Sequence, residues 1–357
     1  MATTSDILWL RIERVNAYGL GVGVHEDLKY YVPGTLVGEE VEVKVVQKHG
    51  RGTLCELVRL ISTNPERTES GCSLFGLCGG CDLQHASYAA QLQLKQNWIS
   101  KIFSRFAETK ILPIVASPQQ WHYRNRITLH HDGHAIGFHK RLSHDVVAVK
   151  NCPIASEALN TKLADLSSAY LTGPRAVELR EDDLSGSFIQ VNTLQNETLL
   201  RIVAERVKGK KSQKILELYS GHGNLTFTLA NLAREVLAVE GDIQAAKRAE
   251  ELRIIRKIKN VKFVHEPAFK YSYELAEKYH QFDVIVCDPP REGLRDVVKI
   301  LPRLCATKIV YVSCEPHALA REAQVLQSKG YVLKTLTPID MFPQTRHVEV
   351  VAEFIKV

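Results

Sequence analysis

Length, composition and charge exclude several classes of protein. The 357 residues include 45% hydrophobic, 24% charged and 7% aromatic residues, which indicates two or three folded domains and excludes a disordered chain or a disulfide-stabilised miniprotein. No stretch approaches the roughly 18 uncharged apolar residues of a membrane helix, and the N-terminus lacks a secretory pattern, so we expect a cytosolic protein. The formal net charge of +6 is compatible with a polyanionic partner without identifying one.

The first part of the chain, residues 1–61, predicts a small β-barrel domain. Apolar and polar residues alternate from about Leu8 to Ile61, and Gly and Pro turns interrupt the alternation. The glycines of AYGLGVG (residues 17–23) precede another strand pattern rather than a helix. They therefore indicate a bend in the barrel and not a phosphate-binding loop.

Residues 62–185 predict a central α+β domain. A polar, turn-rich segment opens it, a helical pattern covers residues 88–106, and later strand patterns are joined by an Asp-Gly turn at Asp132 and Gly133. Between Gln91 and Lys150 there are nine Lys or Arg residues against three Asp or Glu residues, and six histidines. Such a segment is either an ordinary solvated face or a surface that binds RNA.

The eight cysteines fall into groups with different expected roles. Without a secretory signal, metal binding or nucleophilic chemistry is a better expectation than disulfides. Cys72, Cys78 and Cys81 form a C-x5-C-x2-C pattern, and Cys152 is remote. Four thiolates suit zinc or an iron-sulfur cluster; a zinc ribbon usually has two C-x2-C pairs, so the spacing favours iron-sulfur but leaves zinc and free thiols open. We expect three others to be core thiols: Cys55, Cys287 and Cys305.

Residues 186–357 predict a doubly wound, mostly parallel α/β sheet of the Rossmann type. Strand patterns alternate with loops and helical stretches, an order that places a ligand crevice at the carboxyl ends of the strands. The seven strand candidates are residues 214–219, 235–242, 261–266, 282–290, 308–316, 331–340 and 347–357.

A glycine turn follows the first of these strands. In ELYSGHGN (residues 217–224), Gly221 and Gly223 would let the backbone approach a ligand closely, and Glu240 ends the next strand, where it is placed to accept hydrogen bonds from ribose hydroxyls. Because the full G-x-G-x-x-G spacing is missing, S-adenosylmethionine is a better candidate than a dinucleotide. The alternative is a tight turn with a capping Glu.

Two further strand ends carry reactive groups. Asp288 precedes a double proline in CDPPREG, a motif that suits methyl transfer, including transfer to exocyclic amines; a structural turn is the alternative. Cys314 follows the fifth strand. Amine methylation needs no thiol, whereas carbon 5 of uracil becomes nucleophilic only after a group such as a thiolate adds to carbon 6. Glu349 is a candidate for the base that then removes the carbon 5 proton.

Together these motifs resemble the S-adenosylmethionine-dependent RNA uracil-5-methyltransferases over nearly the whole chain. The resemblance rests on the cysteine pattern, GHGN, DPPREGL, VSCEP and the terminal HVE. It implies that the barrel is an OB-like TRAM domain, that Cys314 is the nucleophile and that Glu349 accepts the proton. It also implies a four-iron four-sulfur cluster on Cys72, Cys78, Cys81 and Cys152. The implied contacts with S-adenosylmethionine are Gln190, Tyr219, Asn224, Glu240 and Asp288, in addition to the glycine turn.

The resemblance also implies an RNA-binding segment, and the sequence departs from the family pattern at three positions. WHYRNR (residues 121–126) matches a family segment whose aromatic and arginine side chains we expect to grip RNA. Glu315, Arg346 and Ser220 stand where the family usually has Asn, a small residue and Cys.

The sequence leaves the substrate open. We expect 23S ribosomal RNA, with a transfer RNA T-loop uridine as the alternative. Rival hypotheses are an amine methyltransferase and a noncatalytic RNA-binding factor. The sequence shows no sign of an obligate protein partner.

Overall fold

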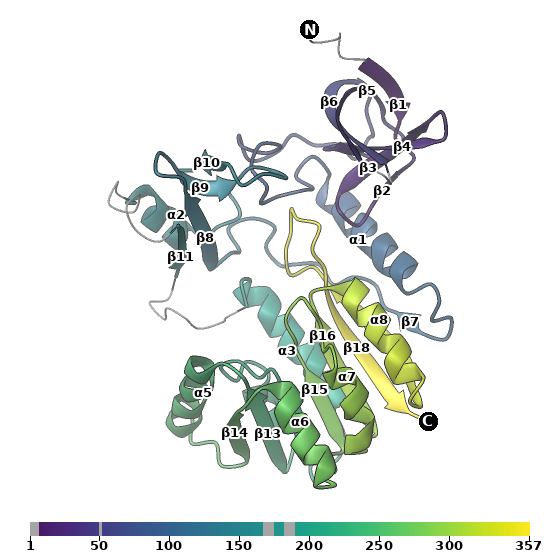
Figure 1. The fold of residues 1–357 in the computed structure, drawn as a ribbon. Helices are drawn as coiled ribbons and strands as arrows, with labels where there is room; N and C mark the ends of the chain where they lie inside the picture. Colours follow the sequence, from purple (N-terminus) through teal and green to yellow (C-terminus); the bar gives the residue numbers. More distant parts are fainter. Residues whose placement is uncertain (1–6, 50–51, 167–174, 182–189) are drawn as a thin grey trace. The chain divides into compact units, whose positions relative to one another are not determined.

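The computed structural model describes residues 7–49, 52–166, 175–181 and 190–357 (Figure 1). The chain divides into two compact units, and both are discontinuous in sequence. The first comprises Met1–Trp98, Gln119–Glu181 and Phe342–Arg346, and the second comprises Ile99–Pro118, Asp182–Met341 and His347–Val357. The predicted division at residues 61, 185 and 357 stays a prediction, and the boundary at 185 lies outside the described residues.

The first unit begins with a β half-barrel. Its six-stranded sheet has the order β1-β5-β6-β4-β3-β2, with Cys55, Val41 and Leu10 among the residues of its apolar core. No helix follows the AYGLGVG glycines; Gly19 has a φ of 72° in the turn before β3, as predicted for a bend. The strands are β1 (Ile7–Arg11), β2 (Arg14–Val15), β3 (Leu20–His25), β4 (Leu28–Pro33), β5 (Glu40–His49) and β6 (Gly52–Ser62).

The rest of the first unit contains a second, smaller sheet. It has the order β10-β9-β8-β11, and Asp132 closes the β8–β9 turn by accepting hydrogen bonds from the backbone of His134 and Ala135, both at 2.9 Å. The Asp-Gly turn is therefore confirmed, and so is the start of the helix expected over residues 88–106, although this helix ends at Ile102. The elements are α1 (Tyr88–Ile102), β8 (Arg126–His131), β9 (Ile136–His139), β10 (Val146–Ala148), α2 (Glu157–Ala164) and β11 (Ala176–Arg180).

The second unit is a Rossmann-like α/β domain. Its eight-stranded sheet has the order β14-β13-β12-β15-β16-β18-β17-β7, and the first five strands of this order run parallel. All seven predicted strands are confirmed, and β7 adds an eighth at the edge. The strands are β7 (Lys110–Ile111), β12 (Lys214–Leu218), β13 (Glu235–Glu240), β14 (Val261–His265), β15 (Val284–Cys287), β16 (Lys308–Ser313), β17 (Tyr331–Ile339) and β18 (Glu349–Lys356).

Continuous apolar runs explain why the central strands are buried. Every residue of β15, Val284 to Cys287, is buried, as expected for a parallel strand covered on both faces. Helices α6, α7 and α8 follow one another in contact, whereas α3 packs against β16, β18 and α4. The helices are α3 (Thr193–Val207), α4 (Thr226–Ala230), α5 (Ile243–Ile255), α6 (Ala268–Glu277), α7 (Val297–Ile300) and α8 (Pro316–Gln327), with a 3-10 helix at Leu301–Leu304.

The prediction that Cys305 is a core thiol is wrong. Cys55 and Cys287 are buried, but Cys305 is exposed because its backbone adopts a left-handed conformation, with a φ of 58°, just after the 3-10 helix. None of the described helices has the length and apolarity needed to cross a membrane. The cytosolic location stays a prediction.

Candidate active site and thiol cavity

The glycine turn after β12 adopts the backbone that its sequence requires. Tyr219, Gly221 and Gly223 have positive φ values of 63°, 55° and 85°. A Cβ at Gly223 would lie 2.7 Å from the Phe227 ring, so this position has no room for a side chain. The left-handed turn is thus specified by its glycines, while Tyr219 adopts a conformation that is uncommon for a residue with a Cβ.

Glu240 holds the glycine turn against the next strand. One of its carboxylate oxygens accepts a hydrogen bond from the backbone of Gly221 at 2.7 Å, and the other accepts one from Asp242 at 2.7 Å. Each carboxylate oxygen can accept a further hydrogen bond. The side chain is therefore both a support for the turn and a possible acceptor for ligand hydroxyls.

Asn224 and Gln190 both belong to the second unit. The amides of Asn224 and Asn196 exchange two hydrogen bonds of 2.9 Å, so α3 fixes the orientation of the Asn224 side chain. Gln190 is buried. Asn196 was missed by the sequence reasoning, because nothing in its local pattern on α3 distinguishes it from a helix-surface residue.

Sheet register brings Cys314 and Glu349 together. Ser313 of β16 pairs with Val350 of β18 in antiparallel register, so the residues one step further, Cys314 and Glu349, lie at the same edge of the sheet. Asp288 follows β15, the strand on the other side of β16. Three side chains that are far apart in the sequence therefore meet where the parallel strands end.

The surroundings of Cys314, Glu349 and Asp288 disfavour the ionised form of each side chain. Burial, together with the carboxyl groups of Glu349 and Asp288, raises the pKa of the Cys314 thiol to about 12, against an opposing effect of Arg291. Burial and, secondarily, Asp288 raise the pKa of Glu349 well above its usual value. Burial raises the pKa of Asp288 to about 7. All are protonated more readily than free side chains, as in a site built to exchange protons.

A third buried carboxyl was missed. Burial raises the pKa of Glu217 to about 8; hydrogen bonding to Thr226 lowers it in part, and Asp288 and Glu240 raise it. Glu217 belongs to the ELYSGHGN motif, but its alternation within β12 gave no sign of a buried acid. The site thus gathers several carboxyl groups, an arrangement that favours a cationic ligand.

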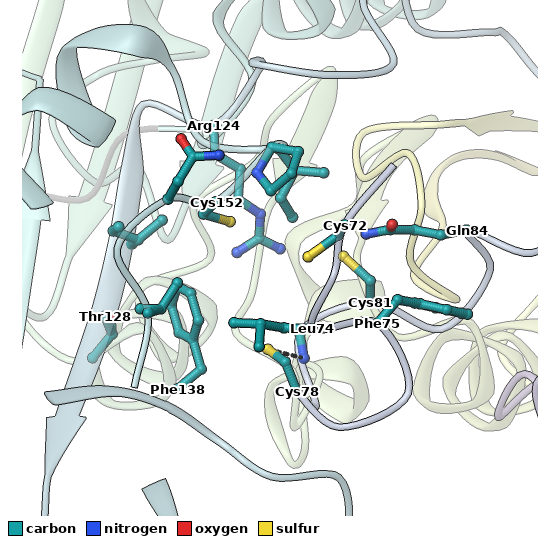
Figure 2. Close-up of a pocket in the computed structure, with 16 residues that line it drawn as sticks. Cys72, Leu74, Phe75, Cys78, Cys81, Gln84, Arg124, Thr128, Phe138 and Cys152 are labelled. Carbon is teal, nitrogen blue, oxygen red and sulfur yellow. Dashed lines mark hydrogen bonds between the residues drawn. The ribbon is translucent and has the colours of Figure 1, made fainter. Parts of the chain in front are cut away.

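The four predicted ligand cysteines surround one cavity in the first unit (Figure 2). The cavity has a volume of about 200 Å³, and the sulfur atoms of Cys72, Cys78, Cys81 and Cys152 face it. Among the described residues, no group of three or more His, Cys, Asp or Glu side chains is arranged around a single metal ion. The four thiols therefore surround a cavity and do not converge on the position of a single ion. Cys152 lies four residues beyond β10.

Burial dominates the electrostatics of these thiols. It raises the pKa of Cys81 to about 12, and it also raises the pKa values of Cys78 and Cys152, with smaller contributions from neighbouring thiols of the set. The backbone N–H of Gly80 points to the Cys78 sulfur at 3.4 Å. Backbone donors of this kind stabilise sulfur ligands that carry negative charge.

Two residues of the WHYRNR motif lie in or beside the interior of the first unit. Arg124 lines the thiol cavity, where its guanidinium group lies among the cysteines (Figure 2), and Tyr123 is only 4% exposed. The Nε atom of Arg124 is buried and has no hydrogen-bond partner among the described residues. Tyr123 is therefore not available at the surface, whereas Arg124 is partly exposed, and the RNA contact expected from the aromatic and arginine side chains of this motif stays a prediction.

A second cavity lies away from these groups. It has a volume of about 300 Å³ and is lined by residues such as Lys214, Glu235 and Phe282, at the amino ends of the strands. Its position at the opposite edge of the sheet from Cys314 separates it from the candidate chemistry.

The chain is similar to known proteins of one family. The model of the family described as tRNA (Uracil-5-)-methyltransferase matches residues 174–356. The 23S rRNA (uracil(1939)-C(5))-methyltransferase of Pseudomonas entomophila is 30% identical over 419 residues, covering 97% of this chain and 93% of the relative. The Pseudomonas fluorescens (strain Pf0-1) enzyme of the same name is 32% identical, with coverages of 97% and 91%.

A solved structure shares the fold. The tRNA (uracil-54, C5)-methyltransferase of Pyrococcus abyssi, in complex with S-adenosyl-L-homocysteine, is similar with a TM-score of 0.76 and 24% identity. The similarity covers 98% of this chain and 100% of that chain. The half-barrel and the Rossmann-like sheet therefore belong to one known architecture.

Proposed function

The chain belongs to the RNA uracil-5-methyltransferase family and uses S-adenosylmethionine to methylate carbon 5 of uracil in RNA, and we propose that its substrate is 23S ribosomal RNA. Similarity to 23S rRNA enzymes over 97% of the chain supports this choice. The half-barrel, which we assign as an OB-like TRAM domain, and the basic segment between Gln91 and Lys150 would bind the RNA.

The substrate is tested by mapping 5-methyluridine in the RNA of cells with and without this gene. We expect the modification to disappear from one uridine of 23S ribosomal RNA in cells without the gene, while transfer RNA keeps its own. Loss confined to a transfer RNA T-loop uridine would establish the alternative substrate, and a methyl group on an exocyclic nitrogen would contradict uracil-5 methylation.

Cys314 and Glu349 would carry the chemistry, as their shared position beside Asp288 supports. The Cys314 thiol would give its proton to water, and its sulfur would attack carbon 6 of the flipped uracil, so that the electron pair of the carbon 5–carbon 6 double bond makes carbon 5 nucleophilic. S-adenosylmethionine supplies the methyl group when bound. Glu349 would then take the proton from carbon 5, and elimination would restore the carbon 5–carbon 6 double bond and release Cys314.

Residues around the glycine turn would hold the cofactor. Gly221 and Gly223 give the backbone its close approach, and Glu240 retains acceptor capacity for ribose hydroxyls. The other contacts that we propose are Gln190, Tyr219, Asn224 and Asp288. The buried carboxyls favour the positive charge of the sulfonium group.

Cofactor affinity should depend on pH through Asp288. Its carboxyl, with a pKa raised to about 7, holds a proton at pH 6 and loses it by pH 8, and a bound cation favours the ionised form. We therefore expect S-adenosylmethionine to bind up to about tenfold more tightly at pH 8 than at pH 6. The uncharged sulfur of S-adenosylhomocysteine should show a smaller change. Calorimetry at both pH values measures this. Glu217, whose pKa is about 8, would leave a residual pH dependence in Asp288→Asn, so a dependence of undiminished size in that variant would contradict the prediction.

Cys72, Cys78, Cys81 and Cys152 would hold a four-iron four-sulfur cluster. A cavity of about 200 Å³ between the thiols fits a bulky inorganic group better than a single zinc ion. The guanidinium of Arg124, whose Nε atom is buried beside the cavity, would offset the negative charge that four thiolates bring. The cluster would tie the loop of Cys72–Cys81 to the segment after β10, and the methylation steps require no redox change.

Metal content provides the test of the cluster. We expect the anaerobically purified protein to be brown and to contain about four iron and four acid-labile sulfide atoms per chain. Cys81→Ser should lose most of both, whereas Cys305→Ser, at an exposed thiol outside the cavity, should retain them. Stoichiometric zinc in the purified protein would overturn the assignment.

A further inference from the structure

The loop between β17 and β18 carries a five-residue segment that belongs to the first unit. Residues Phe342–Arg346 (FPQTR) cluster with the first unit, although the loop begins and ends in strands of the second. Ile339 and Glu349 form the last pair of the β17–β18 ladder, so this loop runs directly into the proposed base. We call Phe342–Arg346 the anchored segment.

Gln344 lies at the centre of the anchored segment in a strained conformation. Its φ is 68°, although it is not a glycine, and it is only 3% exposed. Such a backbone persists only where the surroundings determine it. Here the backbone N–H groups of Asp82 and Leu83 both donate to its carbonyl oxygen at 3.0 Å.

Gln91 of α1 fixes the same residue from a second direction. Its amide donates to the Gln344 side-chain oxygen at 2.9 Å and accepts from the Gln344 backbone N–H at 3.0 Å. Gln91 is 1% exposed, so losing either partner would leave a buried polar group unpaired. Gln91 and Gln344 are therefore buried hydrogen-bond partners, although they lie 253 positions apart in the sequence.

Other polar groups of the anchored segment are also bound within the first unit. The ammonium group of Lys95 donates to the Phe342 carbonyl at 3.1 Å, and the Tyr123 hydroxyl donates to the Pro343 carbonyl at 3.0 Å. The Arg346 guanidinium lies 5.5 Å from the centre of the Tyr18 ring. Arg346, where the family usually has a small residue, thus gains a partner on the half-barrel.

Asp82 connects the anchored segment to the loop of Cys72–Cys81, which we call the thiol loop. It directly follows Cys81, and its carboxylate accepts from the Arg346 backbone N–H at 3.1 Å and from Arg141 at 3.1 Å. Arg141 also donates to the Cys81 carbonyl at 2.7 Å. One buried carboxylate therefore binds the residue that lies three positions before Glu349.

We propose that Asp82 and Gln91 are positioning residues that hold the anchored segment and thereby set the place of Glu349 for proton removal from carbon 5. This inference rests on the proposed function of Glu349. It gives the thiol loop a part in the last step of the reaction. The hydrogen bond from the Arg346 backbone to Asp82 restrains Arg346, and the short stretch of backbone from Arg346 to Glu349 passes this restraint to the proposed base. Earlier steps, which need Cys314, do not depend on this link.

The test separates proton removal from the steps before it. Under single-turnover conditions with substrate RNA, we expect Asp82→Ala and Gln91→Met to form the methylated Cys314–RNA adduct but to resolve it roughly 10- to 100-fold more slowly. The adduct should accumulate on denaturing gels. RNA carrying deuterium at carbon 5 should show an isotope effect on release that the unaltered protein lacks. Asp82→Asn keeps an oxygen for the Arg346 N–H and should largely restore release.

Controls distinguish the possible failures. Glu205→Ala breaks an exposed ion pair with Arg201 on α3 and should behave like the unaltered protein. If Glu349→Gln traps the adduct but neither Asp82→Ala nor Gln91→Met does, the positioning inference is wrong and the proposed base stands. If Glu349→Gln traps nothing, both are wrong. Equal loss of adduct formation and release in both variants would indicate general destabilisation and would also overturn the inference.

Discussion

Cys314→Ala should abolish methylation, with a loss of at least about 10⁴-fold in turnover. Without the sulfur, carbon 5 of uracil has no route to the enolate that accepts a methyl group. Single-turnover transfer of a radioactive methyl group to 23S ribosomal RNA measures this directly. We expect the variant to fold, because the thiol is only partly buried and alanine fits the same backbone.

Two controls accompany this variant. Cys305→Ala removes an exposed thiol remote from the sheet edge and should retain full activity. Binding of S-adenosylmethionine to Cys314→Ala should stay within a few-fold of normal, since the thiol is not among its proposed contacts. Activity close to the unaltered level in Cys314→Ala would exclude the covalent mechanism.

Glu349→Gln should uncouple methyl transfer from product release. The amide keeps the size of the side chain but cannot accept the carbon 5 proton, so the methylated RNA should remain bonded to Cys314. We expect turnover to fall by roughly 10²- to 10⁴-fold while a covalent complex accumulates. A gel that resolves protein from protein–RNA adduct measures both quantities in one experiment.

The double variant strengthens this second prediction. Cys314→Ala combined with Glu349→Gln should form no adduct, because the bond to RNA needs the sulfur. If Glu349→Gln released methylated RNA at the normal rate, another group would have to be the base. The raised pKa of Glu349, caused first by burial and second by Asp288, is consistent with a carboxyl that keeps the proton it receives.

The fold of the second unit was largely predictable from the sequence. Its central strands are apolar runs such as Val284–Cys287, whose burial follows from hydrophobicity alone. Strand β7 was missed because Lys110–Ile111 spans two residues, too few for a periodic pattern. Cys305 was misplaced because an apolar sequence around it gave no sign of the left-handed turn that exposes its side chain.

The residues of the candidate site could be predicted from the sequence only where a reactive side chain ends or directly follows a predicted strand. Cys314, Asp288 and Glu240 follow or end strands, so topology alone brings them to one edge. The burial of Tyr123 and the position of Arg124 at the thiol cavity depend on tertiary partners, which a local pattern of aromatic and basic residues does not reveal. The pairing of Gln91 with Gln344 joins residues too far apart in sequence for local reasoning to connect them.

The anchored segment has a consequence for biosynthesis. The ribosome makes Phe342–Arg346 only after it has made the strands of the methyltransferase sheet up to β17, yet these residues fill polar sites in the N-terminal unit. Until then, the buried amide of Gln91 has no glutamine to bind. Most of the first unit is synthesised early, but it should complete its packing only after Phe342–Arg346 have been made. In a nascent chain stalled before Phe342, the first unit should therefore be sensitive to protease.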